Sequence, residues 1–392
     1  MHYRSDKYGN KLSVLGFGCM RFPSRAGIIN MAETEREILA AIDGGVNYFD
    51  TAYIYPGSEA ALGTILERNG LRDQVYIATK LPHYLIKSKD GLEKLFFEQL
   101  RRLRTDHVDY YLMHMLADAD TWERLKALGI EEWLEKNRRS GAIRQVGFSY
   151  HGNSEAFCKL VDSYDWDFCQ IQYNYMDENS QAGRRGLNHA HSKGIPVIIM
   201  EPLRGGKLVT KLPEEAKDIF AGHSKQYTPA QWAFRWLWDQ PEVTVVLSGM
   251  NSIKMIQDNI NTASSAISGE LDASDQKMLQ QVVAAINANM KVGCTGCGYC
   301  MPCPSNVDIP GTFAAYNRQQ QEGRFWGFID YSVCTIMRKN RTSASNCIAC
   351  GKCEKHCPQN IEIIRKLAEA RIALEGPLYN IFRKVIAWFV KF

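Results

Sequence analysis

Short apolar runs alternate with longer amphipathic runs up to about residue 265 of the chain. The apolar runs have the length of buried strands, whereas the amphipathic runs repeat their apolar positions at the spacing of a surface helix. The predicted strands lie at 13–20, 47–50, 75–80, 108–114, 143–149, 168–174, 196–202 and 243–249. Eight strand–helix units in about 250 residues have the size of a (β/α)8 TIM barrel, so the pattern favours this α/β fold over a doubly wound open sheet.

The pattern changes after the last of these units. We expect the barrel at 1–270, a connecting helix at 271–290, a small α-helical cysteine-rich domain at 291–365 and an amphipathic tail helix at 366–392. The apolar stripe of the tail consists of Leu378, Ile381, Phe382, Val385, Ile386, Phe389 and Val390. Such a stripe fits a helix docked on the barrel, or on a second subunit in a homo-oligomer, better than a helix lying on a membrane surface.

Charge and composition narrow the class of protein. The formal net charge of +4 over 392 residues gives no case for nucleic acid. The chain contains no apolar run of bilayer length, and its first residues lack the apolar core of a secretion signal. We therefore expect a cytoplasmic protein with reduced thiols, and in that compartment clustered cysteines indicate metal ligands.

Most of the 12 cysteines fall into two runs near the end of the chain. The first run is Cys294-x2-Cys297-x2-Cys300-x2-Cys303, and the second is Cys347-x2-Cys350-x2-Cys353-x3-Cys357, each followed by proline. The second run matches the spacing of two-cluster bacterial ferredoxins, and the first is one residue shorter before its last cysteine. The spacing therefore predicts a ferredoxin-like domain that carries two [4Fe–4S] clusters.

In the ferredoxin pattern, three cysteines of a run bind one cluster and the fourth binds the other cluster. The expected ligands of the first cluster are Cys294, Cys297, Cys300 and Cys357. The expected ligands of the second cluster are Cys347, Cys350, Cys353 and Cys303. A [3Fe–4S] centre at one position and a pair of zinc sites are the alternatives, although zinc sites arrange their cysteines in pairs. Cys334, which has apolar neighbours, is expected to be a buried structural thiol.

Chemistry in a (β/α)8 barrel takes place at the C-terminal ends of the strands. The residues at these ends include Asp50, Lys80, His114, Ser149, Gln170 and Met200. Any one of the polar residues alone would fit a structural ion pair or a hydrogen-bonded buried group. Three of them, Asp50, Lys80 and His114, stand at equivalent ends of successive strands, and this arrangement favours a catalytic site.

Four segments of the chain resemble the signature segments of the aldo/keto reductases and occur in the expected order within residues 1–265. They are "YFDTAYIYPGSEAALG", "VYIATKLP", "DYYLMHML" and "VGFSYHG". The resemblance implies that a nicotinamide transfers hydride to a carbonyl and that Asp50, Tyr55, Lys80 and His114 form the catalytic tetrad. A nearby Lys80 ammonium would lower the pKa of Tyr55, and Asp50 would hold that ammonium in place. Tyr55 would then protonate the carbonyl oxygen while His114 orients it.

The resemblance also implies contacts to an NAD(P)(H) cofactor. These contacts are Ser149 and Gln170 at the carboxamide, Met200 at the nicotinamide ring, and Ser248, Lys254, Asp258 and Asn259 at the phosphate and adenine end. The chain departs from the family at Tyr150, Met200, Gly249 and Met255. These departures leave NAD and NADP both open. Because a hydride carries two electrons and a cluster accepts one, coupling the two would require a flavin or a substrate radical.

The whole chain is similar to the aldo/keto reductases that carry a C-terminal ferredoxin-like extension, since "CTGCGYCMPCP" followed by "NVDIP" is typical of that group. Three functions stay open. An iron–sulfur oxidoreductase would act on a small carbonyl or alcohol substrate and exchange electrons with its clusters and a ferredoxin-like carrier. An NAD(P)H-dependent carbonyl reductase would use its clusters only as structural elements. An electron-transfer or docking protein would have a non-catalytic barrel, which the intact tetrad disfavours.

Overall fold

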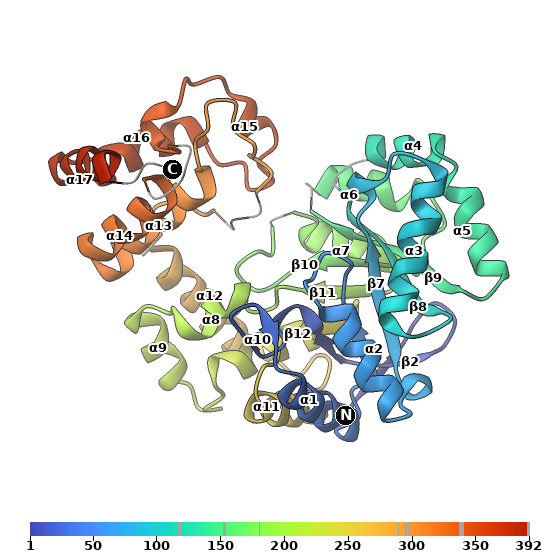
Figure 1. The fold of residues 1–392 in the computed structure, drawn as a ribbon. Helices are drawn as coiled ribbons and strands as arrows, with labels where there is room; N and C mark the ends of the chain where they lie inside the picture. The colour runs from blue at the N-terminus through green and yellow to red at the C-terminus, as the bar shows by residue number, and fades with distance from the viewer. Residues whose placement is uncertain are drawn as a thin grey trace. The chain divides into compact units, whose positions relative to one another are not determined.

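The computed structural model describes residues 1–116, 119–151, 154–179, 181–288, 290–294, 296, 298–336 and 341–389, with the side chains of 321, 322, 333 and 384–389 left out. The chain divides into two compact units (Figure 1). The first unit comprises Met1–Val209 and Tyr227–Asp275, and the second comprises Thr210–Gln226 and Gln276–Phe392. Within the described residues, no helix is long and apolar enough to cross a membrane.

The first unit is built around a closed barrel of parallel strands in the order β10-β11-β12-β3-β6-β7-β8-β9. The strands are β3 (Leu15–Gly18), β6 (Tyr48–Asp50), β7 (Tyr76–Leu81), β8 (Val108–Leu116), β9 (Ile143–Tyr150), β10 (Phe168–Gln172), β11 (Val197–Met200) and β12 (Val243–Ser248). Each of the predicted apolar runs overlaps one of these strands, and β7, β8 and β9 extend one or two residues beyond the predicted ends. The expectation of a (β/α)8 barrel in place of an open sheet is therefore confirmed.

The strands read as continuous apolar runs because both of their faces are buried. Successive side chains of a strand point to opposite faces, and β8 shows this directly. Tyr110 and Leu112 pack in the barrel interior, whereas Tyr111 and Met113 pack against the surrounding helices. The barrel interior is a filled core that also contains Tyr48, Phe168, Ile198 and Val245.

Helices surround the barrel (Figure 1). They are α1 (Met31–Asp43), α2 (Ser58–Arg68), α3 (Lys89–Leu103), α4 (Ala119–Ala127), α5 (Ile130–Arg139), α6 (Ser154–Val161), α7 (Gly183–Ser192), α8 (Lys207–Thr210), α10 (Pro229–Trp238) and α11 (Ile253–Ser265). Helix α4 is additional to the predicted strand–helix units. It is held by Trp122, which is fully buried and packs against Trp166 with ring centroids 4.7 Å apart.

Two short hairpins are also additional to the sequence prediction. They are β1 (Tyr3–Ser5) with β2 (Lys11–Ser13), and β4 (Ser24–Arg25) with β5 (Ile28–Ile29). Strands of two or three residues are too short to show a period in their apolar positions. The turn of the first hairpin is attached to the barrel, because the Tyr110 hydroxyl donates a hydrogen bond of 2.6 Å to Asp6.

The second unit is helical. Its helices are α9 (Glu214–Ala221), α12 (Ala273–Ala288), α13 (Ile309–Glu322), α14 (Arg324–Thr335), α15 (Lys352–Lys355), α16 (Ile363–Leu374) and α17 (Pro377–Phe389), with the first residues of α12 assigned to the first unit. Helix α12 coincides closely with the connecting helix expected at 271–290. The core of this unit includes Val307, Phe313, Tyr331 and Leu367, and the partly buried cysteines pack against it.

The C-terminal tail differs from the single helix expected at 366–392. The expected border falls inside α16, which buries Ile363 and Leu367 in the core of the second unit. In α17, Tyr379 is buried and its hydroxyl lies 2.9 Å from Thr335 Oγ1 and 2.8 Å from Ser343 Oγ.

The residues of the predicted apolar stripe of α17 differ in their exposure to solvent. Phe382 packs against Phe328 with ring centroids 5.6 Å apart, whereas Leu378 and Ile381 are exposed. The side chains of Val385, Ile386 and Phe389, and the whole of Val390, lie outside the described part of the chain. The described half of α17 thus packs on its own unit through Tyr379 and Phe382.

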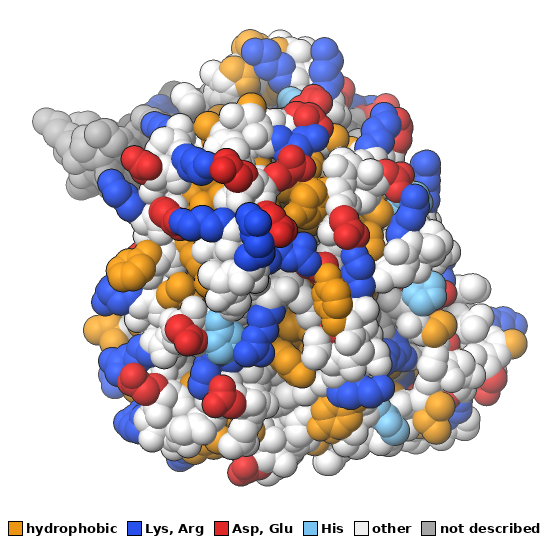
Figure 2. Space-filling view, turned by 90° about the vertical axis from the view of Figure 1, so that its right-hand side faces the viewer, with side chains coloured by type: hydrophobic (Ala, Val, Ile, Leu, Met, Phe, Trp, Pro, Cys, Tyr) orange, Lys and Arg blue, Asp and Glu red, His pale blue; other side chains and the backbone are white. Residues whose placement is uncertain are grey.

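Charged side chains are mixed on the surface. Figure 2 shows that on the described part of this face Lys and Arg alternate with Asp and Glu, without an extended patch of one sign. This mixture agrees with the small formal net charge of +4.

Candidate active site

Five of the predicted site residues lie at one rim of the barrel, at or near the C-terminal ends of its strands. Asp50 ends β6, and Lys80 and His114 lie near the ends of β7 and β8. Ser149 and Gln170 are direct partners in the register of β9 and β10. Because the strands are parallel, residues that are distant in sequence meet at this rim, where barrels place their chemistry.

Asp50 and Lys80 form a buried ion pair. The Lys80 Nζ atom lies 2.6 Å from Asp50 Oδ1 and donates a second hydrogen bond of 2.8 Å to the carbonyl oxygen of Thr51. Burial is the largest single effect and disfavours the ammonium, but Asp50 and Tyr55 together outweigh it, so the pKa of Lys80 is raised. Lys80 is therefore held in its charged form at a fixed position.

Tyr55 lies beside this pair, in the loop between β6 and α2. Its ring centroid is 5.2 Å from Lys80 Nζ and 6.3 Å from the His114 ring, to which it is nearly perpendicular. Burial raises the pKa of Tyr55, and the Lys80 ammonium opposes that rise without reversing it. The lowering effect expected of Lys80 is present, but burial is the larger effect, so the pKa of Tyr55 is raised overall. A raised pKa favours the protonated phenol of Tyr55 at neutral pH.

His114 is buried and neutral. Burial lowers its pKa to about 2, with smaller contributions from Lys80, His151 and His83. Among the described residues, its Nδ1 atom has no hydrogen-bond partner. A neutral imidazole can orient a bound oxygen through a hydrogen bond, but it cannot deliver a proton from a charged form at neutral pH.

The expected carboxamide contacts are buried next to this group. Ser149 and Gln170 are nearly inaccessible to solvent, and Gln170 Nε2 lies 3.6 Å from Met200 Sδ. The Oε1 atom of Gln170 and the Oδ2 atom of Asp50 lack hydrogen-bond partners within the described structure. Buried acceptors without partners are costly, so these atoms suit a site whose ligand supplies hydrogen-bond donors.

At the expected phosphate end, only two of the four predicted residues contact each other. Asn259 Nδ2 donates a hydrogen bond of 3.1 Å to Ser248 Oγ, and both side chains are buried. Lys254 and Asp258 are exposed on α11. These two side chains therefore lie at the surface, and neither forms part of the buried pair.

Sequence reasoning missed Arg21 at this end of the barrel. Arg21 lies in a turn directly after β3, and its side chain crosses Gly249, where an added Cβ would come within 3.3 Å of Arg21 Cδ. Its guanidinium lies 3.6 Å from Glu201 Oε1. A cation that directly follows a barrel strand is the signal that could have identified it.

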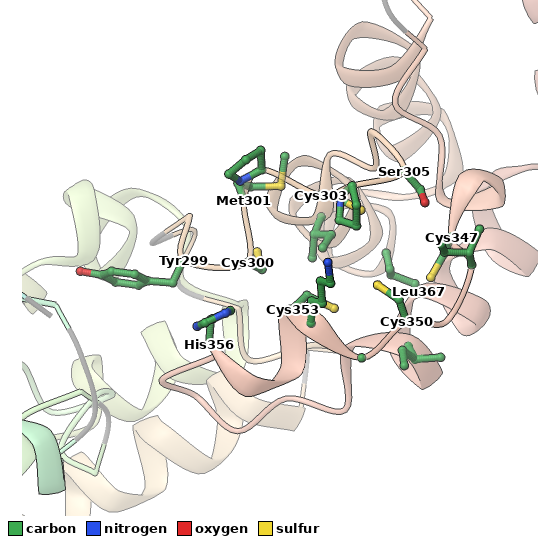
Figure 3. A pocket seen from close by; sticks show the side chains of 17 residues that line it. Tyr299, Cys300, Met301, Cys303, Ser305, Cys347, Cys350, Cys353, His356 and Leu367 are labelled. Carbon is green, nitrogen blue, oxygen red and sulfur yellow. The ribbon is translucent and has the colours of Figure 1, made fainter. Parts of the chain in front are cut away.

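The cysteine runs surround two cavities in the second unit. The larger cavity has a volume of about 330 Å³, and its lining includes Cys303, Cys347, Cys350 and Cys353. In Figure 3 these four cysteines lie around one space. They are the set expected for the second cluster, and they come from both runs.

The smaller cavity is lined by Cys294, Cys300 and Cys357. These three belong to the set expected for the first cluster, and the fourth member, Cys297, lies outside the described residues. Cys300 also reaches the lining of the larger cavity. The fold therefore allows the fourth cysteine of each run to lie beside cysteines of the other run.

The donor set fits iron–sulfur clusters better than zinc. Zinc requires four ligands at about 2.0–2.3 Å from one point. Among the described residues, no three His, Cys, Asp or Glu side chains converge to hold a single metal ion. Cysteines spread around a cavity suit a larger, multi-iron group. Cys334 is buried and its sulfur lies 3.4 Å from the carbonyl oxygen of Tyr331, away from both cavity linings.

Comparison with known proteins matches both parts of the chain. The family model of the aldo/keto reductases matches residues 14–284, and the model of a 4Fe-4S dicluster domain matches residues 293–362. An aldo-keto reductase of Mycobacterium sp. (strain MCS) is 30% identical over 232 residues, which are 58% of this chain and 74% of that protein. An aldo-keto reductase of Mycolicibacterium smegmatis is 33% identical over 230 residues, with the same coverage of 58% and 74%.

Solved structures show the same barrel. The holo form of an aldo-keto reductase from Bacillus halodurans has a TM-score of 0.59 and 22% identity, covering 72% of this chain and 96% of that chain. An aldo/keto reductase from Klebsiella pneumoniae, in complex with NADP and acetate, has a TM-score of 0.58 and 24% identity, covering 71% of this chain and 94% of that one. At these identities the likeness shows the fold.

Proposed function

The chain belongs to the aldo/keto reductase family and carries a C-terminal 4Fe-4S domain, and from this premise we propose that it reduces a carbonyl, or oxidises the corresponding alcohol, at the mouth of its barrel. Membership of the family makes it an oxidoreductase. The observation that carries the proposal is the buried Asp50–Lys80 pair, at 2.6 Å, with Tyr55 and His114 beside it.

In the proposed reaction, Tyr55 is the proton donor. Its raised pKa keeps the phenol protonated at neutral pH, and the adjacent Lys80 ammonium stabilises the phenolate that forms when the proton moves to the carbonyl oxygen. Asp50 holds Lys80 in position and is itself held by that contact. His114, which is neutral, orients the carbonyl oxygen by a hydrogen bond.

The proposed cofactor is NAD(P)(H), which supplies hydride to the carbonyl carbon when it is bound. Ser149 and Gln170 would hold its carboxamide, and Ser248 with Asn259 would lie at its other end. Arg21 adds a cation there, although Gly249 and Met255 replace the cations of other family members. The NADP complex of the Klebsiella pneumoniae relative supports a nicotinamide, whereas the relatives named above give no support to a flavin.

For the second domain, we propose that both cysteine sets bind [4Fe–4S] clusters and that these clusters exchange single electrons with the barrel reaction and with a ferredoxin-like carrier. A substrate radical or a flavin at the barrel mouth would have to divide the electron pair of the hydride into single electrons. When bound, such clusters carry single electrons. Cys350 and Ile348, which line the larger cavity, are exposed, and this exposure suits electron exchange at the surface of the domain. The alternative is that the clusters only stabilise their domain.

Replacement of Tyr55 tests the proposed reaction. Tyr55→Phe removes one hydroxyl and should lower the rate of aldehyde reduction about 10²-fold or more, which is the usual contribution of a general acid. Tyr3→Phe is a matched control, because its hydroxyl only donates to the carbonyl oxygen of Gly45 at an exposed position. Activity of Tyr55→Phe within a few-fold of the unaltered protein would remove Tyr55 from the mechanism.

The role of the clusters is tested by their absorbance under anaerobic conditions. Reduced nicotinamide is mixed with the full-length protein, with and without an aldehyde, and bleaching of the clusters is followed. Bleaching during turnover supports electron exchange with the barrel. Clusters that stay oxidised under every turnover condition would have a structural role, and the proposal for the second domain would fail.

A further inference from the structure

An arginine and a histidine contact each other on the catalytic face of the barrel. His83 opens the short 3-10 helix η3 (His83–Leu85), just after Lys80 at the end of β7. Arg124 lies on α4, which follows β8 and His114. Both residues therefore belong to the segments after the strands, which build the mouth of a (β/α)8 barrel.

The contact with His83 fixes the position of the Arg124 guanidinium. One terminal nitrogen of Arg124, Nη2, lies 3.2 Å from His83 Nδ1 and 3.4 Å from the carbonyl oxygen of His83. Trp122 and Leu125 are buried on the same helix, so the backbone that carries Arg124 is fixed by packing. Arg124 thus approaches His83 from a rigid support, although its own side chain is exposed.

The contact leaves the positive charge of Arg124 uncompensated. A guanidinium can only donate, so His83 Nδ1 accepts, and a ring that accepts at Nδ1 is neutral. Among the described residues, no carboxylate lies within 4.0 Å of Arg124. By contrast, Arg102 pairs with Glu59, Arg138 with Asp167 and Arg204 with Asp177.

The surroundings of His114 are also short of negative charge. Burial is the main cause of the low pKa of His114, and the nearby Lys80 ammonium lowers it further. The nearby carboxylate of Asp50 is bound to Lys80 at 2.6 Å. On the same rim, Glu201 faces Arg21 at 3.6 Å. Of the described carboxylates on this rim, Asp50 and Glu201 each face a cation, whereas no described carboxylate lies within 4.0 Å of Arg124.

We propose that Arg124, positioned by His83, binds a carboxylate of the substrate, so that the substrate is a carbonyl compound that also carries a carboxylic acid. This inference rests on the proposed function of the same site. The planar guanidinium matches a carboxylate in shape. A single guanidinium also balances the single charge of a carboxylate, whereas a phosphate dianion would require further cations.

The experiment compares two aldehydes that differ in charge. Para-carboxybenzaldehyde is the anionic probe, and methyl para-formylbenzoate is its neutral partner. Both are reduced by the full-length protein with NADPH or NADH under anaerobic conditions. The variants are Arg124→Gln, Arg124→Lys and, as a control, Arg139→Gln on the neighbouring helix α5, where the side chain is exposed and 3.7 Å from Glu135.

We expect the Arg124 variants to lose activity on the anionic aldehyde and to keep most of their activity on the neutral one. Arg124→Gln should lower kcat/KM for the carboxylate about tenfold or more, because a hydrogen bond to a charged group contributes about 1.5–3 kcal/mol. The loss should lie mainly in KM, and the neutral ester should change less than a few-fold. Arg124→Lys should restore part of the loss, since it keeps the charge without the planar fork. Arg139→Gln should change neither probe.

Equal losses for both aldehydes, or a loss confined to kcat, would overturn the inference and leave Arg124 with a structural role. A protein that reduces neither aldehyde would contradict the proposed function. In that case, a binding measurement tests separately whether Arg124 binds a carboxylate. Terephthalate is titrated by calorimetry into the unaltered protein and into Arg124→Gln. Binding that weakens in Arg124→Gln alone supports the anion site, and binding that is equal or absent in both overturns it.

Discussion

The hydroxyl oxygen of Ser149 accepts a hydrogen bond of 2.8 Å from the backbone N–H of Met115. Met115 directly follows His114, has a positive φ of 61°, and lies where the register between β8 and β9 shifts. A β-bulge of this kind redirects the side chains around it. Ser149 therefore supports the backbone that presents His114, in addition to the cofactor contact expected for it.

Ser149→Ala tests this support. The change leaves the backbone N–H of Met115 without its acceptor, which should lower the free energy of unfolding by about 1–3 kcal/mol and lower kcat for carbonyl reduction. Urea unfolding and steady-state kinetics measure the two effects. Ser149→Thr retains a hydroxyl and should recover most of both. As a control, Ser163→Ala removes a hydroxyl that bonds only the carbonyl oxygen of Leu160, and activity should not change.

The Asp50–Lys80 pair should show strong energetic coupling. Lys80→Met leaves the buried Asp50 carboxylate without its counter-ion and should cost about 3–5 kcal/mol of barrel stability. The double variant Asp50→Asn with Lys80→Met should cost clearly less than the sum of the two single changes, because no unpaired charge stays buried. Chemical unfolding of all four proteins measures the coupling. Additive costs would mean that the two side chains do not interact as the structure places them.

The pH dependence of carbonyl reduction should reflect the ionisation of Tyr55 alone. Burial raises the Tyr55 pKa above its ordinary value, and the proton donor is active only while it is protonated. The rate should therefore stay level through neutral pH and fall only in the alkaline range. His114, with a pKa of about 2, is neutral throughout and should add no change between pH 5 and pH 8. A step near pH 6–7 that disappears in His114→Gln would contradict this assignment.

Anaerobic protein should contain about eight iron and eight sulfide per chain, the content of two cubane clusters. Cys357→Ser should reduce the content to about half and remove the first cluster, because Cys357 lines the smaller cavity with Cys294 and Cys300. Cys347→Ser should remove the second cluster instead. Iron analysis and electron paramagnetic resonance distinguish the two. Cys334→Ser, which alters a buried thiol, should retain both clusters, and zinc without sulfide would contradict the ligand assignment.

Sequence alone determined the parts of this protein that depend on local pattern. The strands of the barrel are buried on both faces, so each appears as a continuous apolar run between helices. Asp50, Lys80 and His114 stand at the ends of such runs, and parallel strands necessarily bring those ends to one rim. The spacing within each cysteine run is likewise local. It predicted two ligand sets that cross between the runs. In the structure, Cys303 lines the larger cavity with Cys347, Cys350 and Cys353, and Cys357 lines the smaller cavity with Cys294 and Cys300.

Tertiary structure decided the features that depend on groups distant in sequence. The direction of the Tyr55 pKa shift follows from burial, which a motif does not contain. The contact between Arg124 and His83 joins residues 41 positions apart, and that between Ser149 and Met115 joins residues 34 apart. In the tail, the helical period identified an apolar stripe, but only packing selected Tyr379 and Phe382 as the buried side. A sequence pattern records which side chains are apolar or charged, whereas their neighbours, which set pKa values and contacts, are defined only once the chain has folded.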